Sequence, residues 1–407
     1  MSKRISLGIV VGVFGIFGSS AVFAQDACSG QKISKKVDKP IGAAEKAFQA
    51  KNWDEVIAKV AEAEAMTDVT MTDFDKYWLH EFRGRAMLQK QNYPEAMKDL
   101  EASAANPCMP PADLPSRQKI LIQLAYQTKA YPKVIDIGNK VLAAGGDPEI
   151  GTYVGNAYYA TEDYENSRKI MKDVVEKQEA AGKKVDDLTY RILQGSCIKL
   201  KDNPCTIDML ERLVIHYPKP EYWQDLLGLM LAQTKNNVQL LNIWRVADGS
   251  EALTEPAEYT EYAQLAIGQG LPGEAQAVLD RGFQKGVFAK TGKESANQLL
   301  NEAKNAVTLD KSTLDKQDAS AKAKPTGDND VKLGAAYLSY GLNEKAIEAL
   351  QRGIGKGGVK NADDANLLLG MAYLRVGNKP EAAKAFANVK NDPIYARVAR
   401  LWALKAI

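Results

Sequence analysis

The chain is 407 residues long, and its 53 basic residues nearly balance its 51 acidic residues, which gives a formal net charge of +2. Two of the basic residues, Lys3 and Arg4, precede every acidic one, so the chain beyond residue 24 carries 51 charges of each sign. Proteins that bind nucleic acid normally carry a basic excess that displaces counterions. The composition therefore argues against a nucleic-acid partner.

A secretory signal peptide is expected at residues 1–24. Lys3 and Arg4 form a basic start, residues 7–17 are apolar and glycine-rich, and Ala21-Val22-Phe23-Ala24 supplies a small-x-small cleavage pattern. The apolar stretch is shorter than the ~20 residues that a membrane-spanning helix needs. We therefore expect cleavage after Ala24, no membrane span in the remaining chain, and a periplasmic location. An uncleaved membrane anchor is the alternative.

A short signature of a turn followed by a helix start recurs along the chain. Each copy joins a turn residue, usually Gly, Asn or Asp, to a first helical turn in which Pro or Glu is favourable. We expect the turn residue to adopt the left-handed backbone conformation. The clear copies begin at Asn52, Asn92, Ala130, Asp163, Gly270, Gly341 and Gly377, and weaker ones lie at residues 201–204 and 235–238.

The residues before these turns complete a two-helix pattern. Leu369-Gly370-Met371-Ala372-Tyr373 precedes Ala382 and Phe386. This order resembles the tetratricopeptide repeat (TPR), which places leucine, glycine and tyrosine on a first helix and alanine and phenylalanine on a second. Other copies contain Gly334, Gly155 and, in degenerate form, Gly84. Because small residues let antiparallel helices approach closely, we predict an all-α, TPR-like superhelix, or α-solenoid, of antiparallel helical hairpins.

The repeats set the expected domain organisation. After the signal peptide we expect an N-terminal arm at 25–39, TPR-like repeats at 40–309, a polar connector at 310–330 and C-terminal TPR repeats at 331–407. One divergent hairpin should lie between Gly270 and Gly341, with a helix at 294–309. The chain should contain about twenty helices and no strands of note.

Four cysteines in an exported protein indicate disulfides. Cys197 is expected late in one helix and Cys205 early in the next, so the intervening turn would bring them together. The sequence favours this bond. The remaining cysteines, Cys28 and Cys108, would tie the N-terminal arm to the loop after the second hairpin, but reduced, buried thiols are an equally good interpretation.

The sequence indicates neither an enzyme nor a cofactor or metal site. Its two histidines, His80 and His216, are far apart and stand beside aromatic residues, where a packing role is expected. The glycine-rich segment 353–358 follows no predicted strand, so we interpret it as a helix C-cap and loop rather than a phosphate-binding loop.

Binding is therefore expected to depend on the repeat surface. In a TPR superhelix the first helix of each hairpin lines the groove, where a peptide or a partner helix can bind. Packing or plain solvation is the alternative role for each of these positions. The groove-side candidates for partner binding are Trp78, Arg85, Gln89, Asn156, Tyr159, Met371 and Arg375.

The second half of the chain resembles periplasmic TPR proteins that accompany TonB energy-transduction systems. The resemblance rests on residues 220–223, 226–228, 253–258, 263–266, 278–282, 356–361 and 367–372. It implies an accessory protein that binds a TonB-type transducer or its inner-membrane motor and supports uptake of large nutrients through outer-membrane receptors. Composition and spacing alone indicate only an exported TPR scaffold. The alternatives are a general scaffold for envelope assembly or polysaccharide export and an envelope enzyme framed by a helical superstructure.

Overall fold

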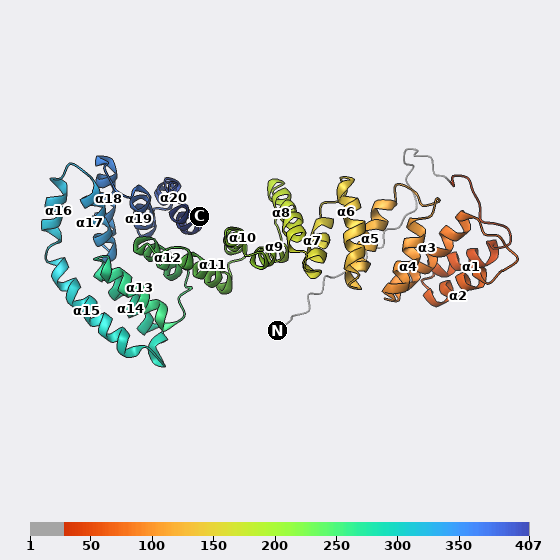
Figure 1. The fold of residues 1–407 in the computed structure, drawn as a ribbon, viewed down its shortest axis with the longest axis horizontal. Helices are drawn as coiled ribbons and strands as arrows, with labels where there is room; N and C mark the ends of the chain where they lie inside the picture. The colour runs from red at the N-terminus through yellow and green to blue at the C-terminus, as the bar shows by residue number, and fades with distance from the viewer. Residues whose placement is uncertain (1–27, 407) are drawn as a thin grey trace. The chain divides into compact units, whose positions relative to one another are not determined.

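The computed structural model describes residues 28–406, so the expected signal peptide at 1–24 lies outside the described residues. The described residues form 21 α-helices and no strand, which confirms the all-α, TPR-like fold class. None of these helices is long and apolar enough to cross a membrane. The chain divides into two compact units, one ending at Asp202 and the other beginning at Asn203 (Figure 1).

Unit 1 is a row of antiparallel helix pairs. Within it, α1 packs against α2, α3 against α4, α5 against α6, and α7 against α8, while each second helix also contacts the first helix of the next pair (Figure 1). The helices are α1 (Asp38–Gln49), α2 (Trp53–Glu64), α3 (Asp73–Gln89), α4 (Tyr93–Ala104), α5 (Leu114–Gln127), α6 (Tyr131–Ala143), α7 (Ile150–Ala160), α8 (Tyr164–Ala180) and α9 (Asp187–Lys199).

The glycines of the repeat signature lie where two helices touch. A Cβ atom added to Gly84 of α3 would lie 2.8 Å from Leu100 Cδ2 of α4, sixteen positions further along the chain. Gly155, Gly334 and Gly370 face Met171, Leu350 and Phe386 with the same sixteen-residue offset, and each pair would clash if the glycine carried a Cβ. The repeat is therefore a packing unit in which glycine permits the close helix–helix approach that TPR-like hairpins require.

The turns differ in one respect from the sequence prediction. Gly270, Gly341 and Gly377 adopt positive φ values of 73°, 72° and 77°, as expected. The expectation was wrong for Asn52, Asn92 and Asp163, because the left-handed residues are their predecessors, Lys51, Gln91 and Glu162. Asn52 and Asp163 instead cap the next helix, and their side chains accept hydrogen bonds from the backbone N–H of Glu55 and of Asn166. Short polar side chains at this position satisfy otherwise unpaired helix N–H groups.

Disulfides account for all four cysteines. Cys28 is bonded to Cys108, and both are buried, so this pairing is confirmed over the reduced alternative. Cys197 of α9 and Cys205 are disulfide-bonded as well, as the sequence favoured. Besides the Cys28–Cys108 bond, hydrogen bonds fix the arm that precedes α1. Ser34 donates from its backbone N–H and its hydroxyl to the buried Asp75 carboxylate at 2.9 and 2.6 Å.

Unit 2 begins with α10 (Asn203–His216). The remaining helices are α11 (Pro220–Gln233), α12 (Asn237–Gly249), α13 (Pro256–Gly268), α14 (Pro272–Gln284), the short 3-10 helix η1 (Val287–Ala289), α15 (Lys293–Lys311), α16 (Leu314–Lys322), α17 (Asp328–Ser339), α18 (Asn343–Lys356), α19 (Ala362–Arg375), α20 (Lys379–Ala387) and α21 (Pro393–Ala403). The helix expected at 294–309 is α15. The polar segment 310–330 contains α16, which packs against α17, and its role as a boundary stays a prediction. The glycine-rich segment 353–358 ends α18, with Gly357 as the C-cap at φ 71°, which confirms its interpretation.

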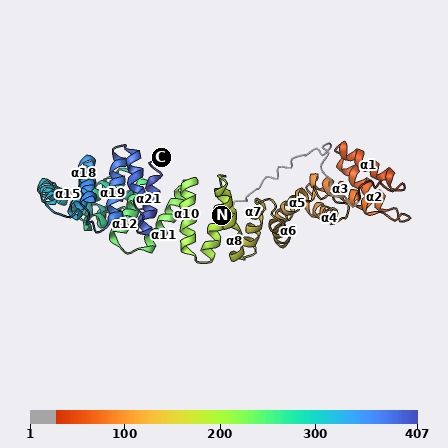
Figure 2. The same ribbon diagram turned by 90° about the horizontal axis from the view of Figure 1, so that it is seen from above.

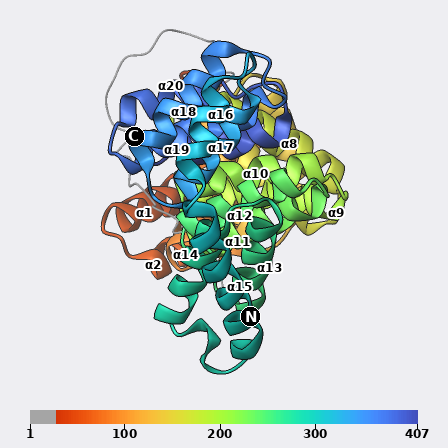
Figure 3. The same cartoon turned by 90° about the vertical axis from the view of Figure 1, so that its left-hand side faces the viewer.

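The last helix of unit 2 returns to the start of the unit. Figures 1 and 2 show α21 beside α12, and Figure 3 shows α16 to α20 gathered above α13 to α15. Glu211 of α10 accepts hydrogen bonds from Arg397 Nε at 2.7 Å and from Arg400 Nε at 2.5 Å. Gln239 of α12 donates to Asp392 at 2.9 Å. These contacts bring helices that are far apart in sequence around a common interior.

Candidate binding site

Three of the groove-side candidates lie on α3 of unit 1. The Trp78 ring is half-buried and stacks on Phe82 with 5.4 Å between ring centroids. Arg85 donates from Nε to Glu81 at 2.8 Å, and 42% of its side chain is exposed. Gln89 is exposed at the end of the helix. Trp78 therefore contributes to helix packing, whereas Arg85 and Gln89 remain available at the surface.

Two further candidates lie on α7. Asn156 donates from its side-chain amide to the Tyr126 hydroxyl at 2.5 Å. Tyr159 meets the ring of Tyr164 edge-on, with 5.4 Å between centroids. Both side chains are partly buried and join neighbouring helices of unit 1.

The last two candidates, Met371 and Arg375 of α19, both line a hollow of about 370 Å³ in unit 2. Met371 is buried, with 3% of its surface exposed. Arg375 donates from Nη1 to the Leu338 carbonyl at 2.6 Å and also lines a neighbouring hollow of about 500 Å³. Of the seven candidates, these two are the ones that border a hollow in unit 2. A partner role for any of the seven stays a prediction.

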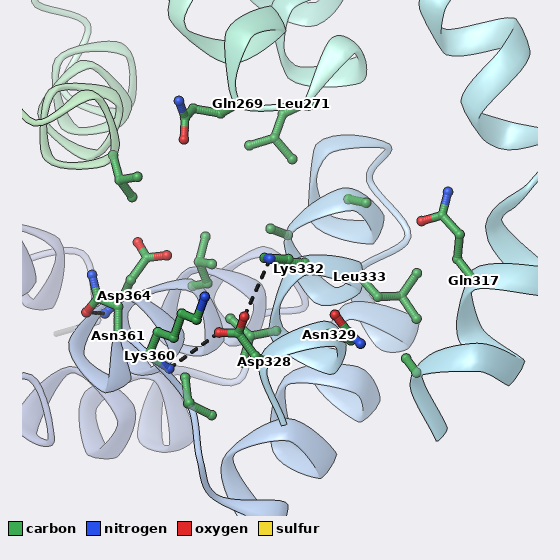
Figure 4. A pocket seen from close by; sticks show the side chains of 18 of the residues that line it. Gln269, Leu271, Gln317, Asp328, Asn329, Lys332, Leu333, Lys360, Asn361 and Asp364 are labelled. Atoms are coloured by element: carbon green, nitrogen blue, oxygen red, sulfur yellow. Dashed lines mark hydrogen bonds and ion pairs between the residues drawn. The ribbon is translucent and has the colours of Figure 1, made fainter. Parts of the chain in front are cut away.

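A larger hollow of about 750 Å³ opens between helices of unit 2, and we call it the α12–α19 pocket (Figure 4). Its walls come from α12, the α13–α14 turn, α15 to α17, and the start of α19. Figure 4 shows Gln269 and Leu271 on the wall opposite Asp364 and Lys360. The volume falls within the range of about 300 to 1,000 Å³ that is typical of small-molecule sites.

A buried ion pair supports one wall of this pocket. Arg245 of α12 donates from Nε and Nη2 to the two carboxylate oxygens of Glu274, both at 2.7 Å, and the Tyr262 hydroxyl donates to Glu274 at 2.6 Å. Burial would raise the pKa of Glu274, but the charge and hydrogen bonds of Arg245 outweigh burial, and the pKa is lowered. Both charges are therefore held in their ionised form inside the unit.

The polar network continues from Arg245 to Asp364 of α19. Arg245 donates from Nη1 to Asn242 Oδ1 at 2.8 Å, and Asn242 donates from Nδ2 to Asp364 Oδ1 at 2.8 Å. The pKa of Asp364 is raised because burial outweighs the favourable charge of Arg245 and the hydrogen bond from Asn242. Asp364 is thus an acidic side chain at the end of a buried network, and it lines the pocket.

Sequence reasoning did not identify this network, because its members lie on four helices, α12, α13, α14 and α19, and Asn242 and Asp364 are 122 residues apart. One local signal was present. Asn242 and Arg245 interrupt the apolar run of residues 240–247, and a charged residue in such a run is either paired or functional.

His80 lies beside an acidic side chain. His80 Nδ1 lies 2.8 Å from Asp99 Oδ1, and Arg83 donates to the same carboxylate. Among the residues that the structure describes, no group of three or more His, Cys, Asp or Glu side chains is arranged to hold a metal ion.

No protein-family model matches the sequence, and no curated protein matches it. Solved structures similar to this chain include TPR proteins. A TPR protein from Parabacteroides merdae ATCC 43184 is 9% identical, with 91% of this chain and 99% of that chain covered and a TM-score of 0.33. The C-terminal part of a TPR repeat-containing protein from Cytophaga hutchinsonii is 16% identical, with 66% and 92% covered and a TM-score of 0.26. A thermophilic TPR protein from Thermus thermophilus is 13% identical, with 63% and 98% covered and a TM-score of 0.19. At these values the likenesses carry no argument about function.

Proposed function

We propose that the protein is a non-enzymatic periplasmic scaffold that binds protein partners through its TPR-like repeats. The observation that carries this proposal is the assembly of both units from helical hairpins, with hollows in unit 2 lined by side chains from several repeats. Helical-repeat proteins present extended surfaces of this kind to peptides and partner helices. The disulfides support export, because such bonds persist in oxidising compartments.

The resemblance to TPR proteins of TonB systems supplies the finer proposal. The partner is a TonB-type transducer or its inner-membrane motor, and the protein assists uptake of iron chelates or other large nutrients. Three residues of the resembling segment 356–361, namely Val359, Lys360 and Asn361, line the α12–α19 pocket. A part of the chain that carries the resemblance therefore belongs to a surface suited to binding.

Deletion of the gene in its own host tests this function. The deletion strain should grow poorly when chelated iron is the scarce nutrient and normally on nutrients that diffuse through the outer membrane freely. The full chain should restore growth, whereas a version that lacks residues 1–24 should not, because it would stay on the wrong side of the inner membrane. Normal growth of the deletion strain under iron chelation would contradict the TonB role and favour the general envelope-scaffold alternative.

A further inference from the structure

Only one oxygen of the Asp364 carboxyl group accepts a hydrogen bond from the described residues. Its Oδ1 accepts the Asn242 amide at 2.8 Å, while no ion pair or hydrogen bond reaches its Oδ2 from the described residues. Arg245, the buried cation whose charge acts on Asp364, is committed to Glu274 by two hydrogen bonds of 2.7 Å. A partly desolvated carboxylate without a paired cation is unfavourable, and a bound cation would relieve that cost.

Other charged side chains also line the pocket, namely Lys316, Lys332 and Lys360, which are basic, and Asp310 and Asp328, which are acidic. Lys332 Nζ lies 3.4 Å from Asp328, so these two charges offset each other. Lys360 donates its backbone N–H to Asp328 at 3.3 Å, and its side chain extends toward the pocket (Figure 4). Among the described residues, no carboxylate forms an ion pair with Lys360. Lys360 is therefore a competing cation at the pocket rim, whereas Asp364 is the anionic point on the α19 wall.

The remaining walls suit an alkyl chain. Leu241 of α12, Leu271 of the α13–α14 turn and Leu368 of α19 line the same cavity as Asp364. Leu271 lies on the wall opposite Asp364 (Figure 4). An alkyl chain can pack against these leucines while a terminal cation pairs with the carboxylate, as long basic side chains do elsewhere.

From this arrangement we infer that the α12–α19 pocket binds an aliphatic ammonium group, with Asp364 as its anionic anchor and the leucines as the site for the alkyl chain. This ligand chemistry has two sources, a lysine side chain of a bound protein segment and a free alkyl amine. The inference goes beyond the proposed function, and a failure of the growth test above leaves it unchanged.

Isothermal titration calorimetry of the full mature chain tests this site with three probes. Acetyl-Ala-Lys-Ala-amide and free pentylammonium should bind, and the norleucine counterpart of the peptide should bind roughly ten- to a hundredfold more weakly, because it lacks the charged donor. Tighter binding of the peptide than of pentylammonium would identify a lysine side chain as the ligand. The reverse order would identify a free amine.

Variants separate the anchor from general effects of charge. D364N should weaken binding of the lysine peptide by a similar factor, whereas D315N should leave it unchanged, because Asp315 on α16 has a 98% exposed side chain and does not line the pocket. K360M should tighten binding, since it removes the competing cation, and this variant remains informative if D364N fails to fold. Equal binding of the lysine and norleucine peptides, or the absence of binding by any probe at millimolar concentration, would overturn the inference.

Discussion

Loss of Arg117 in unit 1 should destabilise the protein far more than loss of a neighbouring arginine that pairs with the same carboxylate. Arg117 Nη2 donates to Glu81 Oε2 at 2.8 Å, and its Nη1 lies 2.5 Å from Oε1, with only 4% and 3% of the two side chains exposed. Replacing Arg117 by methionine keeps most of the volume but leaves Glu81 buried with Arg85 alone. We expect the free energy of unfolding to fall by about 3 kcal/mol, the lower end for a broken buried pair, because Arg85 still compensates part of the charge.

Two further variants make this prediction specific. R85M removes the partner with a 42% exposed side chain and should cost about 1 kcal/mol or less. The double variant E81M/R117M removes both buried charges and should recover most of the loss in R117M. Urea unfolding followed by circular dichroism, fitted without assuming a single transition, gives these values. The reasoning fails if R117M costs no more than R85M, or if the double variant is less stable than R117M.

Three other perturbations follow from the packing, the turns and the charges. G370A should destabilise the protein by about 1–3 kcal/mol in thermal unfolding, because its methyl group would enter the Phe386 ring. G228A in α11 should be neutral or stabilising, because no atom lies within 4 Å of its added Cβ. Equal effects of the two variants would contradict the packing argument. Q91G should raise the free energy of unfolding by about 0.5 kcal/mol. Gln91 has φ 59°, and the backbone strain that glycine removes there exceeds the stability lost through the greater conformational entropy of the unfolded chain. A lower stability of Q91G in urea unfolding would refute this prediction. Burial would raise the pKa of Glu211, but hydrogen bonds from Arg400 and Arg397 outweigh burial and lower it. Its stabilising contribution is therefore present above the ordinary glutamate pKa of 4.5 and lost as the pH falls through the lower folded-state value. E211Q should remove that part of the loss of stability at acid pH. If E211Q loses as much stability between pH 7 and acid pH as the parent protein does, the prediction is contradicted.

The sequence predicted features that depend on local chemistry. Helices begin directly after the predicted turns, for example α8 at Tyr164 and α20 at Lys379, because turn and capping preferences act within a few residues. The repeat glycines were predictable for the same reason, since their packing partners lie one hairpin away, as Gly84 and Leu100 do. The left-handed residue was misplaced at Asn52 because asparagine is favoured both in left-handed turns and as an N-cap.

Features that depend on distant contacts were not predictable. The α12–α19 pocket needs α12 and α19 to meet, and the Asn242–Asp364 hydrogen bond spans 122 residues. Periodicity identifies each helix but not how far a stack of hairpins curves, which is set by small rotations accumulated over the repeats. The Cys28–Cys108 pairing was left open for a related reason, because it depends on the path of an arm that has no repeat pattern.

Partner capture in the native compartment tests the central claim most directly. The full chain with a C-terminal tag would be expressed in its own host, cross-linked in intact cells, purified from the envelope and analysed by mass spectrometry, with a version lacking residues 1–24 as the control. We expect a TonB-type transducer or a subunit of its motor to be cross-linked to the exported protein and absent from the control. Recovery of the exported protein without any cross-linked protein partner would contradict the scaffold function itself.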